Sequence, residues 1–256
     1  PVSNYQCFLI GDGKESARGF ELYYDNKNKN YSIRVFTPSS REDWLLALEY
    51  IKALAKKFDS KIISETGEEY TVDNIDKFDY EGDILYGIEG ISSRIKGEDS
   101  TLYSIFGINR IVSFNQEMID KIENSNSPID TFSNMIKEIQ YLDAFSANQR
   151  FFRNKEDGKI IGTYTLTQNL RTILPYKPSV EFENSDMVKN EDIAFWNIGL
   201  VTIDRDENDR NSYNVAAHLD YDDFIKNLPE NKYRFIDASY IMVEPLNREE
   251  LLGLVK

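Results

Sequence analysis

Residues 20–58 read FELYYDNKNKNYSIRVFTPSSREDWLLALEYIKALAKKF, and this stretch holds the clearest local patterns in the chain. Two runs rich in β-forming residues, 20–24 and 31–36, flank the polar segment 25–30, which is typical of a hairpin. From Trp44 onward, apolar residues recur every three or four positions, and this spacing predicts a helix over 40–57. A hairpin followed at once by an amphipathic helix indicates an α+β protein.

The start of this helix has the features of an N-terminal cap. Pro38 precedes it, and Ser39 is followed three positions later by Glu42, which is the spacing of a capping box. We expect one face of the helix to meet the core through Trp44, Leu45, Leu48, Ile51, Ala55 and Phe58.

Outside this stretch, strands are expected mostly in hairpins. Composition predicts them over 5–10, 61–64, 84–95, 102–114, 150–154, 160–166, 194–203 and 233–243, with polar loops at 96–99 and 155–158. Further helices are expected over 115–123, after the cap Ser127 and Pro128, over 221–228 and over 247–255. The helix after Ser127 should bury Ile129, Phe132, Met135, Ile136, Ile139 and Phe145.

The predicted fold class is therefore α+β, with a mostly antiparallel sheet built from hairpins and amphipathic helices packed on it. One compact unit over 1–256 is expected. The alternative is a division at the acidic segment 65–83, giving an N-terminal region of residues 1–64 and a larger region of residues 83–256.

Composition excludes several classes of function. The 256 residues include 30 Lys and Arg against 44 Asp and Glu, a net charge of −14, so no nucleic-acid partner is expected. The single cysteine, Cys7, and the single histidine, His218, exclude a disulfide framework, a cysteine-based zinc site and a multi-histidine metal centre. No apolar stretch approaches the length of a membrane span and the start lacks a signal-peptide layout, so no membrane association and a cytoplasmic location are expected.

Two local patterns resemble catalytic or binding motifs but fail their requirements. Residues 11–16, GDGKES, lack the spacing of a phosphate-binding loop and precede a predicted strand, so we interpret them as a turn. Cys7 and His218 are the one conceivable nucleophile–base pair, but neither lies in a motif of a known cysteine enzyme. We expect Cys7 to be a buried, inert thiol in a strand and His218 to be partly buried and structural.

Carboxylates cluster late in the sequence. Residues 204–209 begin like a calcium loop but have Asp209 where the loop needs glycine and Val215 at its twelfth position. A solvated turn is the simpler interpretation, with helix capping for 220–223. An irregular magnesium or calcium site is the alternative, with the ligand pool Asp204, Asp206, Asp209, Asp220, Asp222 and Asp223.

Three segments carry a family resemblance: 17–21 (ARGFE), 37–44 (TPSSREDW) and 47–56 (ALEYIKALAK). Together they resemble an uncharacterised bacterial family built on a domain of unknown function. The resemblance implies a bacterial, cytoplasmic origin and brings no activity, cofactor or catalytic residue.

The leading functional hypothesis is a non-enzymatic, acidic module that binds a basic protein, as an immunity-type inhibitor of a nuclease does, with no cofactor. It rests on the net charge, which favours association with a cationic protein. The alternative is an enzyme that uses a divalent metal bound by the carboxylates named above.

Overall fold

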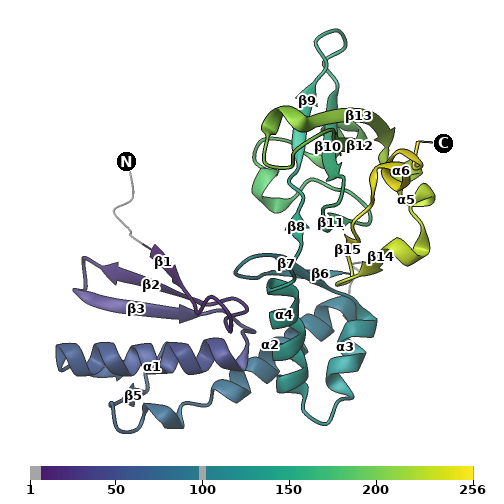
Figure 1. Cartoon of the computed structure of the whole chain (residues 1–256). Helices are drawn as coiled ribbons and strands as arrows, with labels where there is room; N and C mark the ends of the chain where they lie inside the picture. Colours follow the sequence, from purple (N-terminus) through teal and green to yellow (C-terminus); the bar gives the residue numbers. More distant parts are fainter. Residues whose placement is uncertain (1–6, 98–101, 256) are drawn as a thin grey trace. The chain divides into compact units, whose positions relative to one another are not determined.

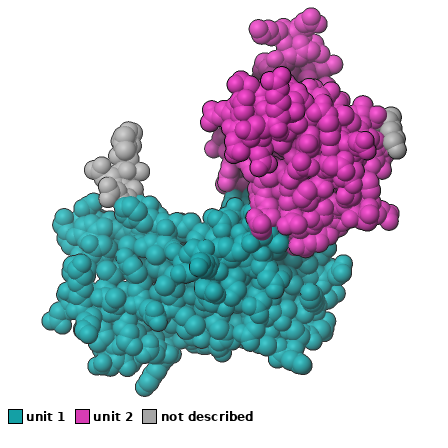
Figure 2. Space-filling model, in the orientation of Figure 1, with its two compact units in different colours: residues 1–142 teal, residues 143–256 magenta. Residues whose placement is uncertain are grey.

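The computed structural model describes residues 7–97 and 102–255. The chain divides into two compact units, 1–142 and 143–256 (Figure 2). The acidic segment 65–83, where the sequence offered a boundary, lies within the first unit. The expectation of one folding unit over the whole chain stays a prediction, which a single cooperative unfolding transition would support.

Unit 1 begins with the predicted meander. Strands β1 (Cys7–Ile10), β2 (Phe20–Asp25) and β3 (Asn30–Val35) form an antiparallel sheet in that order. Residues 5 and 6 of the first predicted strand lie outside the described residues. Helix α1 (Arg41–Phe58) runs along the sheet (Figure 1), and the buried Phe20 ring lies 5.5 Å from that of Tyr50.

The helix predicted over 40–57 is confirmed, but its cap and its buried face differ in detail. Ser40, not Ser39, is the N-cap, and Asp43, not Glu42, closes the capping box. Leu45 and Phe58 are 45% and 48% exposed, so the apolar stripe is narrower than expected. The buried apolar residues of the helix are Trp44, Ala47, Leu48 and Ala55.

Helix α2 (Tyr80–Gly97) corrects a wrong prediction, because residues 84–95 were expected to form a strand. The buried isoleucines 84, 88, 91 and 95 recur at helical intervals and form one face. Gly87 allows close packing, because a Cβ atom there would lie 2.6 Å from the backbone nitrogen of Pro38. The hairpin loop expected at 96–99 is also wrong at residues 96 and 97, which end the helix, and residues 98 and 99 lie outside the described residues.

Unit 1 is completed by two short hairpins and two helices. Strands β4 (Ile62–Ile63) and β5 (Glu69–Tyr70) pair with each other. The run 102–114 is not one strand but a hairpin of β6 (Tyr103–Phe106) and β7 (Ile111–Phe114). Helices α3 (Gln116–Glu123) and α4 (Pro128–Gln140) are confirmed. Phe145 was expected on the buried face of the helix after Ser127, but it lies beyond the end of α4.

Unit 2 contains two four-stranded sheets. The first has the order β13 (Tyr213–Asp220), β12 (Ile193–Ile203), β10 (Ile160–Thr167) and β9 (Arg150–Arg153). The second has the order β14 (Tyr233–Phe235), β15 (Tyr240–Val243), β11 (Thr172–Pro175) and β8 (Phe145–Ser146). The run 233–243 is thus a hairpin rather than one strand. Pairs β10–β12 and β8–β11 are parallel, and the other pairs are antiparallel.

One face of the first sheet belongs to the core of unit 2. Tyr164 and Leu166 of β10, with Ile198 and Leu200 of β12, pack with residues of β11, β15 and helices α5 (Tyr221–Asn227) and α6 (Arg248–Leu252). Both helices are confirmed with their predicted caps, Asp220 and Asn247. Across the described residues, mixed helix and mostly antiparallel sheet confirm the α+β class.

Of the helices in residues 7–97 and 102–255, none combines the length and the apolar character that crossing a bilayer requires.

Candidate functional site

The segments of the family resemblance meet at the start of α1. The carboxylate of Asp43, which is fully buried, accepts hydrogen bonds from the backbone N–H groups of Arg18 and Gly19, both at 2.9 Å. It also accepts from the hydroxyls of Ser39 and Ser40, at 3.0 and 2.8 Å. Segment 17–19 is thereby fastened to the N-terminus of α1, and the role of Asp43 is structural.

Arg18 holds three regions of unit 1 together. Its Nε donates to the carbonyl of Phe106 at 2.8 Å, and its guanidinium also donates to the carbonyl of Pro38. The same group lies 4.9 Å from the centre of the Phe36 ring. Burial lowers the pKa of Arg18 to about 10, so the side chain stays charged at neutral pH.

The predicted turn at 11–16 is confirmed. The Asp12 carboxylate accepts from the backbone N–H groups of Lys14 at 2.8 Å and Glu15 at 3.0 Å, while the Ser16 hydroxyl accepts from the N–H of Asp12. These bonds occupy backbone N–H groups within the turn. In a phosphate-binding loop, such N–H groups would point to the ligand.

The first three candidate ligands lie in the turn between β12 and β13. Asp204 accepts from the side chains of Asn214 and Arg248, both at 2.7 Å. Asp206 and Asp209 each accept from the backbone N–H two residues further on, at 2.9 Å. These carboxylates stabilise the turn, as the simpler interpretation of the sequence holds.

The other three lie around the start of α5. Asp220 accepts from the backbone N–H groups of Asp222 and Asp223, so it caps the helix as predicted. Asp223 pairs with Lys226 at 3.1 Å. Within the portion of the chain that the structure describes, no three His, Cys, Asp or Glu side chains lie where they could together hold a metal ion.

Cys7 and His218 are not brought together by either unit, since Cys7 belongs to unit 1 and His218 to unit 2. Both expectations of burial are wrong: Cys7 is exposed on β1, and His218 is exposed on β13. Both strands lie at the edge of their sheet, so each has a neighbouring strand on one side only.

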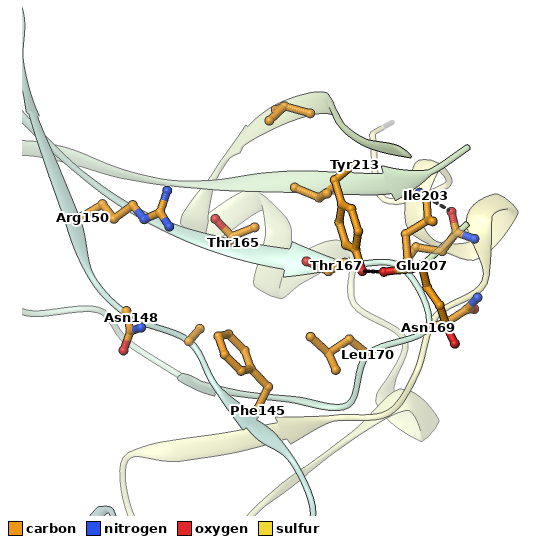
Figure 3. Close-up of a pocket in the computed structure, with 14 residues that line it drawn as sticks. Phe145, Asn148, Arg150, Thr165, Thr167, Asn169, Leu170, Ile203, Glu207 and Tyr213 are labelled. Atoms are coloured by element: carbon orange, nitrogen blue, oxygen red, sulfur yellow. Dashed lines mark hydrogen bonds between the residues drawn. The ribbon is translucent and has the colours of Figure 1, made fainter. Parts of the chain in front are cut away.

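A cavity of about 450 Å³ lies in unit 2, over the face of the first sheet that points away from the core (Figure 3). Its floor follows from the alternation of side chains along a strand. Tyr164 and Leu166 are buried on the core side of β10, so Thr165 and Thr167 point to the other side and line the cavity. Neighbouring strands add Val201 and Ile203 of β12 and Tyr213 and Val215 of β13.

The opposite wall comes from segment 145–150 and the turn after β10. Figure 3 shows Arg150 and Asn148 towards one end, Tyr213 and Glu207 towards the other, and Phe145 and Leu170 across from the threonines. The Tyr213 hydroxyl donates to the carbonyl of Glu207 at 2.7 Å, and the Gln168 side chain accepts from the N–H of Ile203 at 3.1 Å. These bonds fix the Tyr213 end of the cavity.

A second candidate surface lies in unit 1, where aromatic rings meet the acidic segment. The rings of Trp44 and Phe78 lie 5.3 Å apart, and Tyr80 stacks on Trp44 at 6.4 Å. Tyr70 meets the edge of Phe78 at 5.9 Å and donates its hydroxyl to Glu68 at 2.9 Å. Tyr70, Phe78 and Tyr80 are half-buried, so each of these residues keeps part of its surface in contact with solvent.

Carboxylates are concentrated in the segment that carries three of these rings. Segment 64–83 carries eight acidic residues and one basic residue, Lys77. Three of its carboxylates, at 69, 76 and 81, pair with Lys61, Lys52 and Arg41. The exposed Glu65, Glu68, Asp73 and Asp79 have no cationic partner among the described residues. We call residues 64–83 with Trp44 the acidic aromatic surface.

A half-buried carboxyl, that of Glu181, lies among tyrosines in unit 2. The Tyr164 hydroxyl donates to it at 3.3 Å and accepts from the Gln149 amide at 2.6 Å. Burial raises the pKa of Glu181, and it also raises the pKa of Tyr164 and Tyr240. The side-chain carbonyl of Gln149 accepts from the Glu181 backbone N–H at 3.0 Å, so this network holds the loop after β11 to the core.

The residues that line the cavity were not predicted from the sequence. A pattern for them is nevertheless present, because Thr163, Thr165 and Thr167 alternate with Tyr164 and Leu166 and so place three hydroxyls on one face of a strand. Arg150 and Tyr213 join that face only through strand pairing, which local sequence does not specify.

Comparison with known proteins gives one match. No curated protein and no solved structure matches the chain. The model of the family described as "Domain of unknown function (DUF4299)" matches residues 1–254, which includes all three segments of the resemblance noted in the sequence. The chain therefore belongs to the DUF4299 family.

Proposed function

We propose that this protein is a non-enzymatic binding module that engages a basic protein partner through the acidic aromatic surface of unit 1. The observation that carries the proposal is the concentration of charge in segment 64–83, where eight carboxylates stand against one lysine beside half-buried rings. An immunity-type inhibitor that covers a cationic nuclease is one protein of this kind. The proposal includes a bacterial origin and a cytoplasmic location.

The chemistry of the surface suits arginine and lysine side chains. Unpaired carboxylates such as Asp73 and Asp79 can bind a guanidinium or ammonium group directly. The half-buried residues Tyr70, Phe78 and Tyr80 add aromatic rings in the same segment, and aromatic rings attract cations. The ion pairs at Lys52 and Lys61 tie the segment to its own unit, so the surface is already formed before a partner arrives.

The rest of the molecule supports binding more than catalysis by carboxylate-bound metal. Four of the six candidate ligands stabilise a turn or cap a helix, and one pairs with Lys226. The net charge of −14 adds a long-range attraction that speeds encounter with a cationic protein.

The test is a pull-down from the native host at low salt, with the immobilised full chain and mass spectrometry of what is retained. A triple variant, Glu68→Lys, Asp73→Lys and Asp79→Lys, is compared with Glu89→Lys, Glu117→Lys and Glu138→Lys, which changes the charge of unit 1 equally at other exposed positions. We expect basic proteins on the wild type and on the control but not on the first variant. Recovery of no basic protein by the wild type would contradict the proposal.

A further inference from the structure

The cavity of unit 2 differs in character from the acidic remainder of the chain. Of its fourteen lining residues, Arg150 is the one cation and Glu207 the one acid, and the others are uncharged. Its volume of about 450 Å³ falls in the range of sites for small organic molecules, which are mostly apolar with a few placed polar groups.

The apolar portion of the lining is open to solvent. Phe145, Leu170 and Val215 are 49%, 38% and 60% exposed, while Val201 and Ile203, which also line the cavity, are half-buried. When an apolar group enters the cavity, these exposed apolar side chains and the group itself are removed from water, and this burial favours binding.

The polar groups at one end are free to bind a ligand. Neither the guanidinium of Arg150 nor the side chains of Asn148 and Thr165 make a hydrogen bond or ion pair with another described residue. Figure 3 shows the three around the same end of the cavity, away from Tyr213 and Glu207. A planar guanidinium binds a carboxylate through two parallel hydrogen bonds, and amide and hydroxyl groups can complete the shell of the anion.

We propose that this cavity binds a small organic acid, a monocarboxylate with an apolar or aromatic body. Arg150 binds the carboxylate, with Asn148 and Thr165 beside it, and the body lies on Val201 and Val215 between Phe145 and Leu170. One guanidinium balances one negative charge. Because the chain as a whole repels anions, with a net charge of −14, affinity for the acid depends on this one side chain.

The test is a titration of the full ¹⁵N-labelled chain with 4-phenylbutyrate and with the matched alcohol 4-phenylbutan-1-ol. We expect the butyrate to shift the amide resonances of Thr165, Val201 and Val215, and the alcohol to bind at least tenfold more weakly. Arg150→Gln should reduce the affinity for the butyrate to that for the alcohol.

The matched control is Arg153→Gln on the same strand. Arg153 donates to the carbonyl of Gly158 at 3.2 Å and does not line the cavity, so the control should bind the butyrate as the wild type does. The proposal is overturned if the butyrate shifts none of the three amides at about 5 mM, in the millimolar range of weak ligands. It is also overturned if the two arginine variants lose affinity equally.

Discussion

Replacement of Asp43 by asparagine tests how the N-terminal segment is held to α1. The Asp43 side chain is fully buried and accepts five hydrogen bonds, four of them at Oδ2 and the one from Gly19 at Oδ1. Asparagine has nearly the same shape but one acceptor oxygen. The substitution therefore changes donors and charge without opening a cavity.

The expected cost follows from these bonds. If the asparagine oxygen takes the Oδ2 position, its NH₂ group faces the N–H of Gly19, and that buried donor loses its partner at a cost of about 1–3 kcal/mol. The remaining four bonds lose the extra strength of a charged acceptor, which is about 1 kcal/mol or more in sum. We expect Asp43→Asn to lower the free energy of unfolding by about 2–4 kcal/mol.

Urea unfolding followed by tryptophan fluorescence and circular dichroism measures this loss. Ser39→Ala is the matched control, because it removes one hydroxyl donor from the same carboxylate and leaves four, so we expect a loss of about 1 kcal/mol. A loss for Asp43→Asn no larger than that for Ser39→Ala would refute the reasoning. It would mean that the contact between segment 17–19 and α1 contributes little to stability.

Three further predictions concern the core, pH and nucleic acid. Leu48→Ala should destabilise by about 2–5 kcal/mol in denaturant unfolding, because Leu48 is 6% exposed; a loss below about 0.5 kcal/mol would contradict its place in the core. Because the folded state raises the pKa of Glu181, its contribution to stability is complete below the ordinary pKa of glutamate and is lost as pH rises through the raised value. Glu181→Gln should therefore weaken the dependence of the free energy of unfolding on pH above the ordinary pKa of glutamate. An unchanged pH profile would argue against this role of the Glu181 carboxyl. With a net charge of −14, we expect no gel shift with DNA or RNA at about 50 mM salt, and a clear salt-sensitive shift would show a basic face.

Much of the fold could be predicted where local chemistry and tertiary packing agree. The spacing of Trp44 and Leu48, the cap Asp220 and the glycine of the 155–158 loop each indicate the element that forms, and Gly158 has the expected positive φ of 72°. The cap of α1 was predicted one residue early because Ser39–Glu42 and Ser40–Asp43 have the same spacing. Burial of Asp43 among five donors decides between them, and that is a tertiary property.

The errors arise where residue preference and periodicity disagree. Isoleucines 84, 88, 91 and 95 favour a strand by type but a helix by spacing, and Gly87 weakens a helix in isolation. The helix forms because its isoleucine face is buried and because Gly87 lets it approach Pro38. The cavity of unit 2 was beyond local prediction for a different reason: its floor combines β10 and β12, which pair in parallel although a long crossover separates them in the sequence.

The most direct test of the proposed function is the rate of association with the basic protein that the pull-down recovers. Stopped-flow measurements at increasing salt would compare the wild type, the Glu68, Asp73 and Asp79 reversal variant, and the control reversed at Glu89, Glu117 and Glu138. We expect the wild-type rate to fall steeply with salt, and the first variant to associate about tenfold or more slowly than the control at low salt. Equal rates for the two variants would contradict the claim that the partner binds at the acidic aromatic surface.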